Sequence, residues 1–289
     1  MSVPHTYLNG RILPATDATL SLADAGFVSG ATIVDNARTY GGTLFRWAEH
    51  LSRFRRDCER CFVPLLASDD ELTRLAGELL AHNRPLAGMQ DLHVVTVATP
   101  GPPGGPPTLA MSMYPIRVER YRPFFTDGVT LAVAGSQTSD GNDLLPPSVK
   151  HRSRLHWHIA ERAVAAKHPG AVPVVLNRGV GDTAIGAIAA VHADGTLLLP
   201  PPELVQDSIS LKVLTEMAGR SRVERFSWWS DDVVELLLTG TGFGVASVKT
   251  VHHGDTRTFD WPGPMYRRLA KAWSELVGVD YEKQFTEVP

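Results

Sequence analysis

The mixture of strand-like and helix-like segments constrains the fold of this chain more than any other feature. Residues 33–40 are typical of a strand, and residues 47–62 place apolar side chains such as Leu51 and Phe54 on one face of a helix. Strands and helices continue to the end of the chain, without the regular strand–helix–strand alternation of a parallel sheet. The sequence therefore predicts the α+β class.

Two dipeptides predict β-hairpin turns. Asn9-Gly10 lies within the apolar segment 7–13, and Asp194-Gly195 separates the expected strands 184–191 and 196–199. The other expected strands are residues 92–98, 108–114, 129–134, 172–176, 223–226, 236–239 and 244–251. The other expected helices are residues 69–82, 153–167, 211–218 and 265–276.

The pattern of expected strands and helices changes near residue 120. A chain of 289 residues is long enough for one large domain or two medium ones. We therefore expect a small N-terminal domain over residues 1–120 and a larger C-terminal domain over residues 121–289. Residues 117–126 are expected to form the link between them.

The composition argues against several classes of protein. A formal net charge of -3 provides no basic surface for nucleic acid. The first residues, Met1-Ser2-Val3-Pro4-His5, do not read as a secretory signal, and no apolar run approaches the length of a membrane span. The sequence therefore predicts a cytoplasmic protein that binds neither nucleic acid nor membrane.

The two cysteines do not predict a disulfide framework or a metal site. Cys58 and Cys61 have a Cys-x-x-Cys spacing, but they fall within an expected helix. Two small, buried or half-buried residues are the simpler interpretation. No second pair of ligands follows at the spacing that zinc needs, and the paired histidines elsewhere meet the same objection. We therefore expect no bound metal.

Lys150 is the candidate nucleophile. It lies in the segment Leu145-Pro146-Pro147-Ser148-Val149-Lys150-His151-Arg152-Ser153-Arg154, after a loop and before an expected helix. A lysine at such a junction can be held partly desolvated, and it is then usable as an amine nucleophile. Most single lysines are solvated surface charges, so the interpretation depends on other segments.

Other segments follow an order that fits one chemistry. Taken singly, Arg53 is typical of a surface helix, Asp182 of a turn and Ser208 of a helix cap. Together with Lys150, however, these residues follow one ordered pattern. The separate structural explanations would all have to hold at the same time to account for it. The segments are Phe45-Arg46-Trp47-Ala48-Glu49-His50-Leu51-Ser52-Arg53-Phe54, Gly179-Val180-Gly181-Asp182-Thr183, Asp207-Ser208-Ile209-Ser210 and Leu238-Thr239-Gly240-Thr241-Gly242.

From about Tyr7 to Val251, this pattern resembles the fold-type IV pyridoxal-phosphate enzymes. That family includes branched-chain aminotransferases, D-amino-acid aminotransferases, R-selective amine aminotransferases and aminodeoxychorismate lyase. The resemblance implies two lobes, a small N-terminal α/β lobe and a larger, mixed β-barrel-like C-terminal lobe that carries the lysine. It also implies pyridoxal 5'-phosphate as the cofactor and assembly as a homodimer.

The resemblance assigns a role to each residue of the pattern. Lys150 holds the cofactor as a Schiff base and later moves a proton. Asp182, where the family usually has Glu, is the anion near the ring nitrogen. Arg53 supplies charged donors to the phosphate. Further phosphate contacts come from backbone and hydroxyl groups of Ser208, Ile209, Ser210, Gly240 and Thr241, with the glycines at 240 and 242 allowing close approach.

Departures from the family pattern bear on the substrate. Arg38 lies on the strand that faces the cofactor in the family, and its guanidinium is suited to a substrate carboxylate. Substrate preference cannot be carried over from any one member of the family. Residues that differ from the usual pattern are Val34-Asp35, Leu155, Asp182, Ala187, Ser208, Ser210 and Leu211.

Three hypotheses about function follow from the sequence. The first is an aminotransferase that moves an amino group between an amino acid or amine and a 2-oxo acid through a Lys150 Schiff base. The second is a lyase that carries out β-elimination on the same scaffold, similar to aminodeoxychorismate lyase. The third is a protein that has lost catalysis and serves in binding, since a fold does not determine a function.

Overall fold

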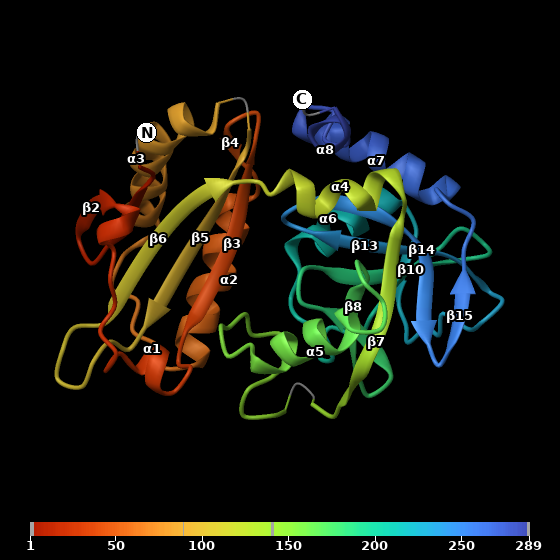
Figure 1. The fold of residues 1–289 in the computed structure, drawn as a ribbon, viewed down its shortest axis with the longest axis horizontal. Helices are drawn as coiled ribbons and strands as arrows, with labels where there is room; N and C mark the ends of the chain where they lie inside the picture. Colours follow the sequence, from red (N-terminus) through yellow and green to blue (C-terminus); the bar gives the residue numbers. More distant parts are fainter. Residues whose placement is uncertain (1–2, 89, 140–141, 288–289) are drawn as a thin grey trace. The chain divides into compact units, whose positions relative to one another are not determined.

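The computed structural model describes residues 3–88, 90–139 and 142–287 (Figure 1). The chain divides into two compact units. Unit 1 comprises Met1–Ile116 with Lys150–Ser153, and unit 2 comprises Arg117–Val149 with Arg154–Pro289. The division after residue 116 lies close to the boundary expected after residue 120. Unlike the expected division, it groups the segment that begins with Lys150 with the N-terminal unit.

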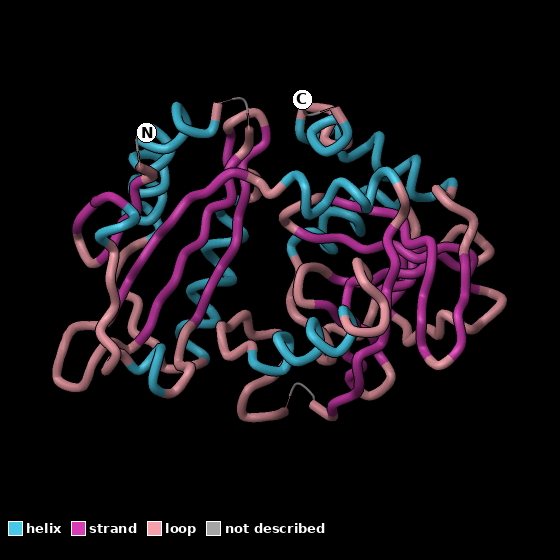
Figure 2. Tube along the Cα trace, viewed as in Figure 1, coloured by secondary structure: helices cyan, strands magenta, loops and turns pink. Residues whose placement is uncertain are grey.

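Unit 1 is built on an antiparallel sheet with the strand order β2-β1-β6-β5-β3-β4. Figure 2 shows β6, β5 and β3 running side by side. The predicted Asn9-Gly10 hairpin is confirmed, because β1 pairs with β2 and both turn residues have positive φ, 45° and 88°. The strands are β1 (His5–Leu8), β2 (Arg11–Pro14), β3 (Ile33–Tyr40), β4 (Thr43–Leu44), β5 (Leu92–Thr99) and β6 (Thr108–Pro115).

Two long helices of unit 1, α2 (Trp47–Arg60) and α3 (Asp69–Ala87), pack on one face of this sheet. A single apolar core joins Ala37 of β3 to Leu51 of α2 and Leu79 of α3. The Ser68 side chain and the Glu71 side chain cap the start of α3 reciprocally. Two short elements precede β3, the 3₁₀ helix η1 (Ala15–Asp17) and the helix α1 (Ala25–Val28).

Unit 2 is built on a mixed β-barrel, as expected. Its strand order is β12-β11-β10-β13-β14-β7-β8-β9, and a further pairing of β9 with β10 closes the ring. β7 runs parallel to both β14 and β8, whereas the other pairs within the ring are antiparallel. The strands are β7 (Val129–Gln137), β8 (Val172–Asn177), β9 (Val180–Thr183), β10 (Ala187–His192), β11 (Leu197–Leu199), β12 (Ser221–Val223), β13 (Val233–Gly240), β14 (Gly244–His253) and β15 (Asp255–Thr258).

Two expectations about unit 2 are wrong. Residues 117–126 are not a link, since they contain the helix α4 (Val118–Thr126), whose buried residues Val118, Tyr121 and Phe124 recur every third position. The strand expected at residues 223–226 lies earlier, as β12, where it pairs with β11. The other helices are α5 (Leu155–Ala165), α6 (Ile209–Ala218), α7 (Pro264–Val277) and α8 (Lys283–Thr286). Over the described ranges, no helix is long and apolar enough to cross a membrane.

Candidate active site

The backbone of Lys150 is anchored to unit 1 on both sides. Its N–H donates to Asp57 Oδ2 at 2.9 Å, and its carbonyl oxygen accepts from the Val34 N–H at 3.1 Å. Two residues later, the Arg152 N–H donates to the Thr32 carbonyl at 2.9 Å. The segment therefore lies along the beginning of β3, and the Lys150 side chain is half-buried.

A buried cluster of charged and polar side chains connects β3 with α2. Asp35 Oδ2 accepts from Arg53 Nε at 2.8 Å, and Asp35 Oδ1 lies 2.6 Å from His50 Nδ1. The Arg53 side chain is only 4% exposed, so it is not the surface arginine that its residue type alone suggests. Burial acts to raise the pKa of Asp35, but the charge of Arg53 and the hydrogen bonds with Arg53 and His50 outweigh it and hold that pKa well below its usual range. Asp35 is therefore a buried carboxylate with a fixed negative charge.

His50 lies next to these charged groups but is itself uncharged at pH 7. Burial is the main cause that lowers its pKa, and the positive charges of Arg53 and Lys150 add to it. The neighbouring Asp35 opposes this shift without cancelling it. His50 is thus held neutral at pH 7.

Asp57 is a second buried carboxylate on α2, one turn after Arg53. Besides the Lys150 N–H, it accepts from Arg56 through Nε at 3.1 Å and Nη2 at 2.8 Å. Its side chain is 1% exposed, whereas that of Arg56 is 51% exposed. Burial raises the pKa of Asp57, and the hydrogen bonds from Lys150 and Arg56 limit that rise.

Arg38 lies on β3 with partners from its own unit. Its Nε donates to the Thr39 carbonyl at 2.9 Å, and its Nη2 lies 3.7 Å from Asp91 Oδ2. The guanidinium carbon also lies 3.8 Å from the centre of the Tyr40 ring. These contacts, with the burial of Arg38, favour a structural role for this residue.

In unit 2, Asp182 lies on β9 and is half-buried. Its Oδ1 accepts from the Thr183 N–H at 2.8 Å, and its Oδ2 accepts from the Gln206 N–H at 3.2 Å. Asp182 is paired across the ladder with Ala187 of β10. Two backbone donors therefore orient the carboxylate, and the small Ala187 side chain stands beside it.

The start of α6 contains the predicted serines. Ser208 is the N-cap, and its hydroxyl oxygen accepts from the Leu211 N–H at 3.2 Å. Ile209 and Ser210 form the first turn, and both side chains are buried. This end of a helix presents backbone N–H groups and a positive dipole, which suit an anion.

The glycine-rich turn after β13 approaches unit 2's own backbone closely. A Cβ on Gly240 would lie 2.3 Å from the Ile185 carbonyl oxygen, and a Cβ on Gly186 would lie 2.4 Å from the Thr239 carbonyl oxygen. A Cβ on Gly242 would meet the Tyr121 hydroxyl at 2.5 Å. These glycines are thus required by contacts inside unit 2, which is a different reason from the phosphate approach that the sequence suggested. Thr241 in this turn is half-buried.

The cysteines match the simpler of their two interpretations. Cys58 is buried and Cys61 is half-buried, and both are free thiols. Burial raises the pKa of Cys58 to about 12, so it is not a reactive thiolate at pH 7. Within the described part of the chain, no group of three or more His, Cys, Asp or Glu side chains could hold a metal ion.

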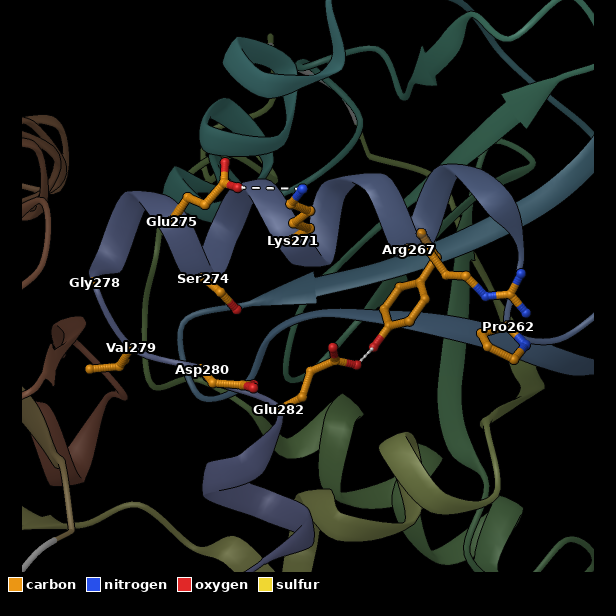
Figure 3. A pocket seen from close by; sticks show the side chains of 10 residues that line it. Pro262, Arg267, Lys271, Ser274, Glu275, Gly278, Val279, Asp280 and Glu282 are labelled. Atoms are coloured by element: carbon orange, nitrogen blue, oxygen red, sulfur yellow. Dashed lines mark hydrogen bonds and ion pairs between the residues drawn. The ribbon is translucent and has the colours of Figure 1, made fainter.

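Unit 2 also has a pocket of about 600 Å³ along α7 that contains none of the predicted site residues (Figure 3). Its titratable groups contact one another. The Tyr266 hydroxyl donates to Glu282, and Lys271 lies 3.9 Å from Glu275. Burial raises the pKa of Tyr266, which keeps its hydroxyl protonated. We assign no chemistry to this pocket.

Comparison with protein-family models matches residues 32–251 to the family described as amino-transferase class IV. The match covers well over half of the chain. The chain belongs to the class IV aminotransferase family. The family resemblance noted from the sequence is therefore confirmed.

Curated relatives of this member of the class IV aminotransferase family have different names. A putative branched-chain-amino-acid aminotransferase of Methanocaldococcus jannaschii is 24% identical over 263 residues, covering 84% of this chain and 86% of the relative. A D-alanine aminotransferase of Staphylococcus epidermidis is 35% identical over 82 residues, which is 28% of this chain and only 29% of that relative's length. The local and the nearly full-length similarity are thus to relatives with different names.

Solved structures show the same fold. The branched-chain amino acid aminotransferase of Escherichia coli has a TM-score of 0.83 at 18% identity, with 96% of this chain and 95% of that chain covered. A hypothetical aminotransferase of Mycobacterium tuberculosis in a PLP-bound form has a TM-score of 0.79 at 19% identity, with 98% and 99% covered. The two-unit α+β architecture is therefore that of these structures.

Within this member of the class IV aminotransferase family, the sequence alone did not single out Asp35, His50 and Asp57 as candidate site residues. Asp35 was noted only as a departure from the family pattern. A signal for two of them was present in α2, where His50, Arg53 and Asp57 recur at spacings of three and four. Polar residues at that spacing, beside the apolar face of a helix, indicate a buried polar cluster.

Proposed function

We propose that this chain is a pyridoxal 5'-phosphate-dependent aminotransferase, which moves an amino group between an amino acid or amine and a 2-oxo acid. The observation that carries the proposal is the half-buried Lys150 in a member of the class IV family, anchored through its backbone to Asp57 of α2, the helix that also carries the buried Arg53. An amine and a guanidinium held in one cluster suit an aldehyde and a phosphate of one small molecule.

The chemistry of the remaining donors also fits this cofactor. Asp182 offers an oriented carboxylate for a protonated ring nitrogen. The first turn of α6, with Ser208, Ile209 and Ser210, offers N–H groups and hydroxyls for the phosphate. Gly240 and Thr241 add a backbone turn and a hydroxyl. When bound, the cofactor supplies an electron sink for a carbanion at the substrate carbon.

The roles of the side chains follow from their chemistry. Lys150 Nζ would hold the cofactor aldehyde covalently, with loss of water. Once a substrate amine displaced it, the free lysine amine would take the proton from the substrate carbon and return it. Arg53 Nε is already bonded to Asp35, which sets the orientation of the guanidinium that anchors the phosphate. The role of Arg38 in binding a substrate carboxylate stays a prediction, and its contacts with Asp91 and Tyr40 favour a structural role.

A spectroscopic experiment tests the covalent bond. The purified protein should show cofactor absorbance that sodium borohydride changes, and mass spectrometry should then locate the reduced cofactor on Lys150. Lys150→Ala should lose the covalent product and slow conversion of an amino donor by about 10²- to 10⁴-fold, the range for loss of a positioned acid–base group. Lys249→Ala, at an exposed lysine, is the matched control and should behave as wild type. A wild-type protein that binds no pyridoxal phosphate would refute the proposal.

A screen of D- and L-amino acids and simple amines separates the three functional hypotheses. Stable accumulation of the amine form of the cofactor supports transamination. Release of pyruvate without that amine form supports β-elimination instead. Cofactor binding without turnover of any donor supports a binding protein.

We also propose that the chain forms a homodimer, as the family resemblance implies. Among the aromatic residues of unit 2, Phe124 and Trp228 are buried, whereas Trp229 is 41% exposed and is a candidate for the interface. Gel filtration at several concentrations should give a species of twice the chain mass. A strictly monomeric species would contradict this assembly.

A further inference from the structure

Helix α2 carries two buried charges on one face, and each relates to a different part of the proposed cofactor site. Arg53 and Asp57 are four residues apart, so their side chains lie one turn apart on the same side of the helix. Arg53 is 4% exposed and Asp57 is 1% exposed. Burial raises the pKa of Asp57, and the nearby positive charge of Arg53 is one of the causes that limit this rise.

Asp57 links this helix to the backbone of Lys150. Its Oδ2 accepts the Lys150 N–H at 2.9 Å, while Arg56 occupies Oδ1 through two N–H groups. On the other side of Lys150, the Val34 N–H donates to its carbonyl at 3.1 Å. A hydrogen bond from a buried backbone N–H to a carboxylate is charge-assisted, and its loss leaves the donor unsatisfied.

The same helix therefore fixes two positions, that of the Arg53 side chain and that of the Lys150 main chain. Asp35 orients Arg53 through Nε, and Asp57 holds the main chain at Lys150, 93 residues later in the sequence. A rigid cofactor that is bonded to Lys150 and held at its phosphate by Arg53 needs a fixed separation between these two residues. A helical turn provides such a separation, because the positions of side chains four residues apart are set by the backbone.

We propose that Asp57 is a positioning residue, which holds the Lys150 backbone in register with Arg53 so that the lysine amine reaches the cofactor aldehyde. This inference rests on the proposed function, and it assigns Asp57 no contact with substrate or cofactor. Removal of the carboxylate releases the Lys150 main chain while the Arg53–Asp35 pair remains in place. The bound cofactor is then held by its phosphate but is joined to the lysine less completely.

The test compares Asp57→Ala, Asp57→Asn and Cys58→Ala with wild type. Asn keeps a side-chain oxygen of the same reach, so Asp57→Asn should restore most of the behaviour. Cys58→Ala removes a neighbouring buried side chain, 1% exposed, and serves as the control for general loosening of α2. Hydrogen exchange at the Lys150 amide is measured in the purified protein with and without added pyridoxal phosphate. Absorbance spectra give the share of bound cofactor that is a free aldehyde.

We expect the Lys150 amide of Asp57→Ala to exchange at least about tenfold faster than in wild type, as loss of a hydrogen bond to a charged group implies. A larger share of its bound cofactor should be the free aldehyde. Asp57→Asn should stay within about threefold of wild type in exchange. Cys58→Ala should leave the aldehyde share unchanged, because it keeps the Asp57 carboxylate that accepts the Lys150 N–H.

Several outcomes would overturn the inference. One is a wild-type Lys150 amide that exchanges at the rate of an unprotected amide, a measurement that needs no variant to fold. Another is an Asp57→Ala protein with the exchange rate and spectrum of wild type, or one that Cys58→Ala matches in both. If wild-type protein forms no covalent bond to the cofactor at all, the proposed function fails instead, and the exchange data still report whether Asp57 holds Lys150.

Discussion

The candidate residues in the two units differ in physical character. In unit 1, Asp35, Arg53 and Asp57 are buried charged groups: Asp35 orients Arg53 through a short side-chain contact, and Asp57 accepts from the Lys150 N–H. In unit 2, Asp182 is half-buried and is oriented by backbone N–H groups, and the Gly240 turn is set by close approach of main chain to main chain.

This difference determines what each region is sensitive to. A buried charge is stable only while its partner remains, so the unit 1 cluster should respond strongly to loss of one partner and to pH. A turn set by steric contact carries no charge, so it should respond to added volume and not to pH. The comparison can be tested by removing a charge or changing the pH, which should affect unit 1, and by adding volume at a glycine, which should affect unit 2.

The largest effect is expected from Asp35→Ala. Removing this carboxylate leaves the buried Arg53 charge without the oxygen that its Nε now contacts at 2.8 Å. Loss of one partner of a buried ion pair costs about 3–5 kcal/mol, and we expect the free energy of unfolding to fall by that amount. Urea denaturation of the purified protein measures it.

The matched control for Asp35→Ala is a carboxylate in an exposed pair of the same unit. Glu78 pairs with Arg74 four residues earlier on α3, and the two side chains are 44% and 60% exposed. Glu78→Ala should cost less than about 1 kcal/mol, since solvent screens such pairs. If both variants lost the same free energy of unfolding, the buried Asp35–Arg53 pair would be no more sensitive to loss of a partner than an exposed pair.

A smaller effect is expected from Gly240→Ala in unit 2. The new Cβ would lie 2.3 Å from the Ile185 carbonyl oxygen, which is a backbone atom and cannot rotate away. We expect a loss of about 1–3 kcal/mol, the usual cost of adding volume to a packed site. The loss should be the same at pH 5.5 and pH 7.5, because no charge is involved.

Gly77→Ala is the control for this substitution. Nothing lies within 4 Å of a Cβ at Gly77, which is inside α3. The same change of one methyl group should stabilise the protein there by about 0.5–1 kcal/mol, because Ala favours the helix more than Gly does. A destabilisation at both positions would argue against a steric cause at Gly240.

The sequence predicts much of the fold because many of its signals are local. The Asn9-Gly10 and Asp194-Gly195 turns follow from the backbone preferences of two residues, and both hairpins form as expected. The helix α4 was missed although Val118, Tyr121 and Phe124 recur at helical spacing. The change in sequence pattern near residue 120 suggested a link over residues 117–126 instead.

The candidate site is less predictable, because its decisive contacts join residues far apart in the chain. Asp35 meets Arg53 across 18 residues, and Asp57 meets Lys150 across 93 residues. The residue types alone do not reveal these pairs. Lys150 and Arg53 could be selected by their resemblance to a family pattern, whereas the residues that orient them needed the tertiary structure.

The smallest expected effect concerns His50, and it isolates the pH response of unit 1. Burial lowers the pKa of His50 below its usual value near 6.5, so the unfolded chain binds a proton at this position before the folded protein does. Stability should therefore decrease as pH falls below about 6.5, by at most about 1.4 kcal/mol per pH unit for one group. Asp35 has a depressed pKa, and its contribution is lost only at lower pH, below its unfolded value of 3.8.

Urea denaturation between pH 7.5 and pH 5 measures this slope in wild type and in His50→Gln. The variant should lose stability less steeply, since glutamine does not titrate and its amide can still donate to Asp35. His252→Gln is the matched control, because the pKa of His252 is also lowered by burial but this side chain is partly exposed, so its substitution should change the slope less. Identical slopes for wild type and His50→Gln would mean that folding does not change the pKa of His50, which contradicts the prediction. A steeper loss in His50→Gln would mean that His50 is protonated in the folded protein and that its contact with Asp35 is an ion pair.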